Sequence, residues 1–384
     1  MNPEENITNR QIIEPYLLDP KENYPEPYYM LEYNGVPFSA IGGIQALSGQ
    51  KKNGKTFVLA QLMAAVLATG CDRVNTYLPG LRVPDRTLEH LRNVKNNDKY
   101  LPKVLYIDTE MEKLNSAKVL RRVHWLCDWP MGEKVDRFNV LWLRSVKDDK
   151  DENGRITWKA YQKRWYIIKA AIDELQPDIV FIDGLRDIIG DFNDNTQSAS
   201  LVGDLMALAE DKHICIWGVL HMNPRPGNDD ESKMRGHLGT ELGNKVTDTL
   251  VSIKERKGSQ VSFLVRQMDA RGKDLDDWRF EVTEAAGALG VPKIISNPVT
   301  TEQTKAKADS LEDIKAWINK AMDMYEWPMT RADVKKKIFG EIGGQKNTGQ
   351  QQADLQAAMN EGLLKESTLK ANGYYMLMYE DYPF

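Results

Sequence analysis

Short apolar runs alternate with longer amphipathic segments from residue 41 to about residue 220. The apolar runs, which we expect to be strands, cover residues 44–47, 104–107, 140–143, 179–182 and 214–220. The segments between them, which we expect to be helices, cover residues 56–69, 112–127, 158–175 and 197–212. A strand that is buried on both faces is almost continuously apolar, and strands that alternate with helices form parallel sheets. The pattern therefore predicts an α/β domain with a mostly parallel sheet.

Strands without intervening helices are expected near residues 248–254, 260–266 and 278–282. Lys257-Gly258 separates the first two and is typical of a tight turn, so we expect an antiparallel edge of the sheet there. Residues 1–40 are rich in Pro, Tyr and Glu, and we interpret them as an extended N-terminal arm or a cover. Residues 71–101 are polar and turn-rich and are interpreted as an insertion. The main domain is then expected over residues 41–283.

Small and polar residues over 284–309 indicate a linker to a second, smaller domain at residues 310–384. That domain is expected to contain helices at 311–325, 330–338 and 350–362, a glycine-containing turn at 340–344, and strands at 362–366 and 373–379. This order of elements predicts a winged helix-turn-helix domain.

The composition is that of a folded protein in a reducing compartment. The chain of 384 residues has 51 Lys and Arg against 56 Asp and Glu, which gives a formal net charge of −5. Its three cysteines form no CxxC pair, so a disulfide framework or a cysteine-based zinc site is not expected. We find neither a signal-peptide pattern nor an apolar run of the roughly 20 residues that a membrane span needs, and we expect a cytoplasmic protein without a membrane partner. Because the charge is mildly acidic, binding of nucleic acid would need a local basic patch.

The strongest motif is Gly49-Gln50-Lys51-Lys52-Asn53-Gly54-Lys55-Thr56, which fits G-x-x-x-x-G-K-[ST] and lies between a predicted strand and a predicted helix. This context is typical of a P-loop, whose backbone N–H groups surround phosphate oxygens. Lys55 would reach the β- and γ-phosphates of ATP, and the Thr56 hydroxyl would bind Mg²⁺. The predicted nucleotide-binding residues are Gly49, Gln50, Lys51, Lys52, Asn53, Gly54, Lys55, Thr56 and Phe57.

Carboxylates follow two of the predicted strands. Asp183 ends the apolar run 179–182, the Walker B position, where an Asp completes the Mg²⁺ site; the alternative is an Asp that caps a turn before Gly184. Glu110, just after the strand at 104–107, can activate water as a general base. Asp108 competes with Glu110 for this role, and Glu112 suits the N-terminus of a helix.

These elements together resemble the RecA-like P-loop ATPases, in particular the RepA-type plasmid helicases and their DnaB- and KaiC-like relatives, over about residues 35–283. The resemblance carries a P-loop, a strand followed by Asp-Thr-Glu-Met, an apolar strand followed by Asp-Gly, and a strand ending in His. It implies that Glu110 is the catalytic glutamate and that His221 senses the γ-phosphate. A histidine that merely satisfies a strand end is the alternative for His221.

The resemblance also implies contacts with nucleic acid and with a second subunit. Lys233 and Arg235 lie in a loop that would face nucleic acid, although acidic neighbours suit an ordinary surface loop equally well. Arg266 or Arg271 would reach the phosphates of an adjacent subunit, but their spacing departs from the family pattern and either could be a surface arginine. Lys346 of the winged helix could contact DNA, whereas the slight acidity of that domain also suits a protein partner.

We therefore expect a Mg²⁺-dependent ATPase with ATP and Mg²⁺ as ligands, built as a RecA-like core with a C-terminal winged helix. The resemblance implies a homo-oligomeric ring, such as a hexamer, that acts as a helicase or remodels DNA, with single-stranded DNA as the expected substrate. Partners would be proteins of the replication or mobilisation of a plasmid or similar element. The alternative is an ATP-dependent regulator or adaptor that binds DNA or a replication partner without translocating.

Overall fold

The chain forms two compact units, Met1–Ile295 and Ser296–Phe384, in a computed structural model. The structure describes residues 9–24, 26–222, 234–270, 272–285, 289–295, 309–327, 329–330, 333–344, 351, 354–355, 357–359, 361–371 and 374–379.

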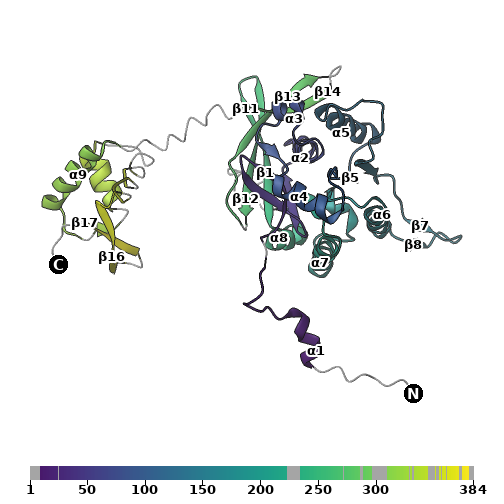
Figure 1. Ribbon diagram of the computed structural model, residues 1–384, viewed down its shortest axis with the longest axis horizontal. Helices are drawn as coiled ribbons and strands as arrows, with labels where there is room; N and C mark the ends of the chain where they lie inside the picture. The colour runs from purple at the N-terminus through teal and green to yellow at the C-terminus, as the bar shows by residue number, and fades with distance from the viewer. Residues whose placement is uncertain are drawn as a thin grey trace. The chain divides into compact units, whose positions relative to one another are not determined.

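The first unit is built around a sheet with nine strands within the described residues, in the order β14-β13-β12-β11-β3-β10-β9-β5-β6 (Figure 1). The six strands from β11 to β6 are parallel, whereas β12, β13 and β14 continue the sheet in antiparallel fashion. The predicted parallel sheet with an antiparallel edge is thus confirmed. The bounds are β3 (Ile44–Gly49), β5 (Val104–Asp108), β6 (Phe138–Trp142), β9 (Ile179–Asp183), β10 (Cys215–His221), β11 (Asp248–Lys257), β12 (Gln260–Ala270), β13 (Trp278–Ala285) and β14 (Leu289–Ile295).

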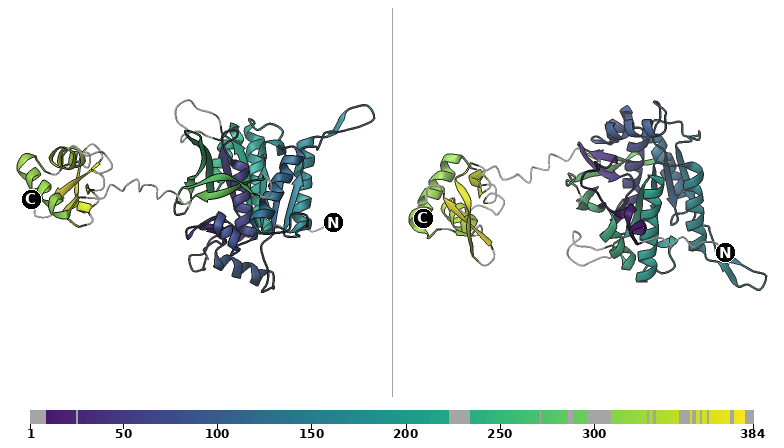
Figure 2. Two further views of the ribbon diagram at one scale, coloured as in Figure 1. Left: turned by 90° about the horizontal axis from the view of Figure 1, so that it is seen from above. Right: turned by 60° about the horizontal axis from the view of Figure 1, so that its bottom comes forward.

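Helices cover both faces of this sheet (Figure 2). Helices α2 (Lys55–Leu67) and α5 (Lys113–Leu126) pack on one face. Helices α6 (Ala160–Leu175), α7 (Asn195–Lys212) and α8 (Gly236–Lys245) pack on the other. Successive residues of β9 therefore enter two different cores, with Phe181 on the α2 side and Ile182 on the α7 side. This double burial explains the continuous apolar runs of the central strands.

The N-terminal segment is more than an arm. Residues 29–40 form the antiparallel hairpin of β1 (Tyr29–Tyr33) and β2 (Val36–Ala40), and β1 also pairs with β4 (Leu81–Arg82). Leu31 and Phe38 of this hairpin are completely or almost completely buried in the α2-side core. Of the two interpretations of residues 1–40, an extended arm or a cover, residues 29–40 therefore fit the cover, because their interior-facing side chains complete the core. Only α1 (Asn9–Ile13) and η1 (Glu14–Tyr16) precede the hairpin as helical elements among the described residues.

The predicted insertion and linker also contain regular structure. Helices α3 (Asp72–Tyr77) and α4 (Asp85–Val94) lie within residues 71–101. Strand β14 lies in the segment predicted as a linker, where it pairs with β13 along its whole length, so the sheet extends beyond residue 283. Another small hairpin, of β7 (Asp149–Lys150) and β8 (Ile156–Trp158), extends from the body of the unit (Figure 1).

The second unit has its own apolar core. Helix α9 (Leu311–Met324) and the π-helical segment η4 (Val334–Ile342) pack together, and β15 (Met329–Thr330), β16 (Leu364–Ala371) and β17 (Tyr374–Tyr379) form a sheet in the order β15-β17-β16. The segment predicted as a helix from residue 330 thus begins with a short strand and becomes helical only at Val334. Among the residues that the structure describes, no helix is long and apolar enough to span a bilayer.

Candidate functional site

The glycine-rich loop connects β3 to α2 and is tightly held. Gly54 precedes the first helical residue with φ of +84°, a conformation that favours glycine. A Cβ atom on Gly49 would lie 2.5 Å from the carbonyl oxygen of Ser252 on β11, so no side chain fits at the start of the loop. The Ser252 hydroxyl in turn donates a hydrogen bond to the Asn53 carbonyl oxygen. The neighbouring strand β11 therefore holds both sides of the loop, whose helix N-terminus suits a phosphate group.

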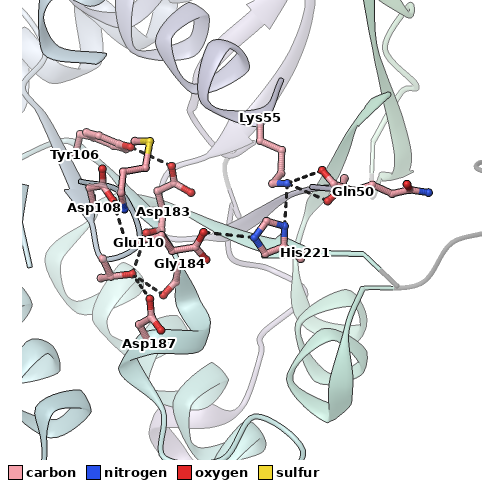
Figure 3. Close-up of polar contacts among 12 residues, drawn as sticks. Gln50, Lys55, Tyr106, Asp108, Glu110, Asp183, Gly184, Asp187 and His221 are labelled. Carbon is pink, nitrogen blue, oxygen red and sulfur yellow. Dashed lines mark hydrogen bonds and ion pairs between the residues drawn. The ribbon is translucent and has the colours of Figure 1, made fainter. Parts of the chain in front are cut away.

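Lys55 turns back over this loop (Figure 3). Its Nζ donates hydrogen bonds to the carbonyl oxygens of Gly49 (3.0 Å) and Gln50 (2.9 Å), and it lies 3.0 Å from Nδ1 of His221. Burial lowers the pKa of Lys55. The ammonium group thus lies over the phosphate cradle. It makes hydrogen bonds that an incoming phosphate can replace.

Asp183 ends β9 and is buried beside Tyr106 of β5. The Tyr106 hydroxyl donates a hydrogen bond to Oδ2 of Asp183 at 3.0 Å (Figure 3). Burial raises the pKa of Asp183 to about 7. An ionised carboxylate is therefore costly here without a cation, which fits a site for Mg²⁺. The hydroxyl of Thr56, in the first turn of α2, is the other ligand that the loop offers.

Mg²⁺ in such a site takes much of its coordination from water and from nucleotide phosphates. The described part of the chain has no cluster of three or more His, Cys, Asp or Glu side chains arranged to hold a metal ion. The donor set of one buried carboxylate and one hydroxyl beside a phosphate cradle thus fits Mg²⁺ bound together with a nucleotide.

Asp108, the last residue of β5, and Glu110, two positions later, have different surroundings. Asp108 is fully buried, and its Oδ1 accepts hydrogen bonds from the backbone N–H groups of Glu110 (3.0 Å) and Met111 (2.9 Å). The Ser116 hydroxyl donates to its other oxygen. Asp108 therefore holds the turn between β5 and α5, and it has no access to a water molecule at the phosphates.

Glu110, in contrast, lies in the cleft and faces His221. Its Oε2 is 3.3 Å from Nε2 of His221, and the hydrogen bond from His221 lowers the pKa of Glu110 against the opposing effect of burial. Because the Lys55 ammonium group donates to Nδ1 of His221, Nε2 is the ring nitrogen that can donate to Glu110. His221 thus connects the P-loop lysine to the carboxylate.

The pairing of strands explains this position of His221. It is the last residue of β10, directly opposite Gly49 in the parallel ladder with β3, and β10 pairs with β9 on its other side. The backbone carbonyl oxygen of His221 accepts a hydrogen bond from the N–H of Arg235 at 2.9 Å. The segment that leaves the sheet after His221 therefore returns to the same place at the start of α8.

Several residues of the site were not among those predicted from the sequence. Thr109 donates a hydrogen bond to Asp187 at 2.9 Å, and Gly184 leaves room for both Thr109 and Glu110. Tyr106 appears in the sequence only as one apolar position of a buried strand. Arg186, from the short helix η2 (Leu185–Ile188), lines the cleft together with Gln50, Glu110 and His221. A signal for Arg186 exists in hindsight, since it lies three positions after Asp183.

The remaining predicted residues lie elsewhere. The Phe57 side chain packs with Phe263 and Phe280 and under Arg122, so only its backbone is close to the loop. Arg266 forms an ion pair with Asp277 within the same chain, in which Nε and an Nη group both donate to Oδ2 at 3.0 Å. Arg271, Lys233 and Lys346 lie outside the described residues.

Residues 36–225 match the family model of an AAA domain. This match supports a P-loop ATPase in that part of the chain. No curated protein matches the sequence. Among solved structures, a KaiC-like protein of the hyperthermophilic archaeon Pyrococcus horikoshii OT3 is similar at 12% sequence identity, with 70% of this chain and 99% of that chain covered and a TM-score of 0.42.

Proposed function

We propose that this protein is a Mg²⁺-dependent ATPase that acts on DNA, as a helicase or DNA-remodelling enzyme in the replication or mobilisation of a plasmid or another mobile element. The observation that carries the ATPase part is the row of contacts from Lys55 through His221 to Glu110, between a phosphate cradle and a general base.

The chain's own residues account for each part of the hydrolysis. The loop and Lys55 bind the triphosphate; Thr56 and Asp183 would hold Mg²⁺, which would supply neutralisation of phosphate charge. Glu110 orients a water molecule and accepts its proton while the water oxygen bonds to the γ-phosphorus. The bond from that phosphorus to the bridging oxygen breaks, and ADP leaves with the electron pair. His221 keeps Glu110 ionised and contacts the γ-phosphate once Lys55 has moved to it.

Two observations favour action on DNA. The segment between Met222 and Met234 begins and ends at the site itself, since these two residues form a β-bridge beside His221. A change in position at the γ-phosphate can therefore be transmitted to DNA that is bound by this segment. Lys233 and Arg235 are the candidate contacts with that DNA. The second unit, with a helical layer and a small antiparallel sheet, suits a winged helix in which Lys346 contacts nucleic acid.

A homo-oligomeric ring would add an arginine from a second copy, which stabilises charge in the transition state. Arg271 and Arg266 are the candidates for this arginine, and Arg266 would have to leave Asp277. The alternative function is an ATP-dependent regulator or adaptor that binds DNA or a replication protein without translocation. The ion pair of Arg266 favours this alternative, because it occupies one of the two candidate arginines.

Steady-state ATP hydrolysis with and without single-stranded DNA tests the proposal. We expect Lys55→Ala to abolish binding of a fluorescent ATP analogue. Glu110→Gln should retain binding and lower kcat roughly 10²- to 10⁴-fold. Glu112→Gln is the matched control, because Glu112 is an exposed acid at the start of α5, two positions further along.

Stimulation by DNA that both site variants abolish would support a DNA-dependent motor, and strand displacement would then be measured. ATP hydrolysis that is indifferent to DNA would contradict the motor and favour the adaptor. Undiminished hydrolysis by Glu110→Gln would contradict the assigned base.

A further inference from the structure

Two arginines share one aromatic ring next to Glu110. The guanidinium carbon of Arg186 lies 4.5 Å from the ring centre of Phe192, and that of Arg235 lies 5.7 Å from the same centre. Arg186 comes from η2, directly after Asp183 and Gly184, whereas Arg235 precedes the first residue of α8. Elements that are far apart in the sequence thus bring two cations to one ring.

The hydrogen-bonding groups of both arginines remain available. Within the described parts of the chain, neither guanidinium makes a hydrogen bond or an ion pair, and both residues are exposed. A stacked ring contacts the flat face of a guanidinium and leaves the N–H groups at its edge. The ring therefore orients both groups without using their donors.

Both cations lie beside the residues assigned to hydrolysis. Arg186, Arg235 and Phe192 line a narrow pocket together with Glu110 and His221. A cleft of about 580 Å³ shares four of these residues, Glu110, Arg186, His221 and Arg235, and is also lined by Gln50 of the P-loop. Arg186 is close enough to contribute to the lowered pKa of Glu110.

We propose that Arg186 and Arg235 form an oxyanion subsite that holds the phosphate released from ATP before it leaves the protein. This inference rests on the proposed ATPase function. Guanidinium groups bind phosphate through two parallel N–H donors, and a dianionic or monoanionic product beside Glu110 needs such cations. A DNA backbone phosphate has the same chemistry, but both arginines line the large cleft together with the catalytic base Glu110, which favours the small product.

Product inhibition by inorganic phosphate tests the subsite. ATP hydrolysis by the full chain is measured against increasing phosphate, with ADP affinity measured separately by titration. We expect Arg186→Gln and Arg235→Gln each to raise the inhibition constant of phosphate roughly tenfold, while ADP affinity changes less than about twofold. Phe192→Leu removes the shared ring but neither cation, and we expect a smaller rise.

Arg73→Gln is the matched control. Arg73 also stacks on an aromatic ring, with its guanidinium 4.6 Å from the centre of Trp125, but it pairs with Asp128 and does not line the cleft. The inhibition constant of phosphate for Arg73→Gln should equal that for the wild type. If the arginine variants fail to fold, Phe192→Leu still tests the arrangement.

The outcomes separate the two proposals. A wild-type protein that neither binds ADP nor hydrolyses ATP would contradict the proposed function. A protein that hydrolyses ATP, but whose phosphate inhibition is absent or the same in all variants, overturns the subsite alone. A loss of affinity for single-stranded DNA in Arg186→Gln and Arg235→Gln, at constant phosphate inhibition, also overturns it and assigns the arginines to nucleic acid.

Discussion

Nε2 of His221 lies 3.3 Å from Oε2 of Glu110, although 111 residues separate them in the chain. His221 is the last residue of β10, and Glu110 lies two positions after β5. These strands are not neighbours, since β9 lies between β10 and β5. Both side chains reach across the end of Asp183's strand and meet in front of it. This contact connects the base that would activate water to the lysine that would bind the γ-phosphate.

Removal of the imidazole should change how hydrolysis depends on pH. The hydrogen bond from His221 lowers the pKa of Glu110, so His221→Ala should raise that pKa. A general base must be ionised, and the rate of the variant should therefore begin to fall at a higher pH than that of the wild type. We also expect kcat to drop about tenfold or more. A pH profile of kcat measures both effects, with His237→Gln on the exposed surface of α8 as the control. An unchanged acid limb would contradict the contact.

Asp183 should make the nucleotide-free protein less stable as the pH rises. Its folded pKa of about 7 lies above the ordinary value of 3.8, so between these values the folded state holds a proton that the unfolded state has lost. Stability should therefore decline from about pH 4 to about pH 7, by an amount on the order of a few kcal/mol.

Asp183→Asn cannot titrate and should lack this decline. We expect the difference in melting temperature, variant minus wild type, to be larger at pH 8 than at pH 5 when EDTA is present. ATP hydrolysis by this variant should be lost. Thermal melts at the two pH values check this. A difference in melting temperature that is the same at both would refute the shifted pKa.

Gly184 follows Asp183, the proposed Mg²⁺ ligand, and lies against Glu110, the proposed base. It has φ of +109°, and a Cβ atom there would lie 2.1 Å from Oγ1 of Thr109 and 2.9 Å from Cγ of Glu110. Gly184→Ala should therefore displace Glu110 and lower kcat by roughly 10²-fold or more, with a loss of about 1–3 kcal/mol in stability. Binding of ATP should persist.

Gly203→Ala provides the comparison for Gly184. Gly203 lies in α7 with no atom within 4 Å of an added Cβ, so alanine should stabilise the helix by about 0.5–1 kcal/mol and leave hydrolysis unchanged. Denaturant unfolding and steady-state kinetics measure the pair. Equal kinetics for the two variants would show that Gly184 has no positioning role.

Arg266 can be tested against its own partner. If Arg266 only stabilises the edge of the sheet, Arg266→Gln and Asp277→Asn should each lower the free energy of unfolding by about 0.2–1 kcal/mol. Both variants should then keep the kcat of the wild type. If Arg266 acts on a second copy, only Arg266→Gln should lower kcat, by roughly tenfold or more. Mixing Arg266→Gln with Glu110→Gln protein distinguishes the two cases, since a site shared between copies regains activity only when one copy supplies each intact residue.

Much of the core and the P-loop could be predicted from the sequence because their signals are local. Each central strand is apolar at consecutive positions, and the spacing from Gly49 to Thr56 places a phosphate cradle between a strand and a helix. Glu112 and Cys127 flank α5 as expected from the pattern around it. Local patterns also predicted the antiparallel edge, since a turn at Gly258 separates two strands without room for a helix.

The choice between Asp108 and Glu110 needed the tertiary structure. Both are acids at the end of the same strand. Only the packing shows that the carboxylate oxygens of Asp108 accept hydrogen bonds from the backbone of the turn and from Ser116. The same holds for residues 29–40, whose few apolar side chains show no clear period yet fill a gap in the core. Local sequence thus determined which segments are strands, helices and phosphate loops, because backbone conformation and burial on two faces depend on neighbouring residues. The partners of each charged side chain, from Glu110 with His221 to Arg186 with Phe192, depend on which strands meet at one edge of the sheet, and only the folded chain decides that.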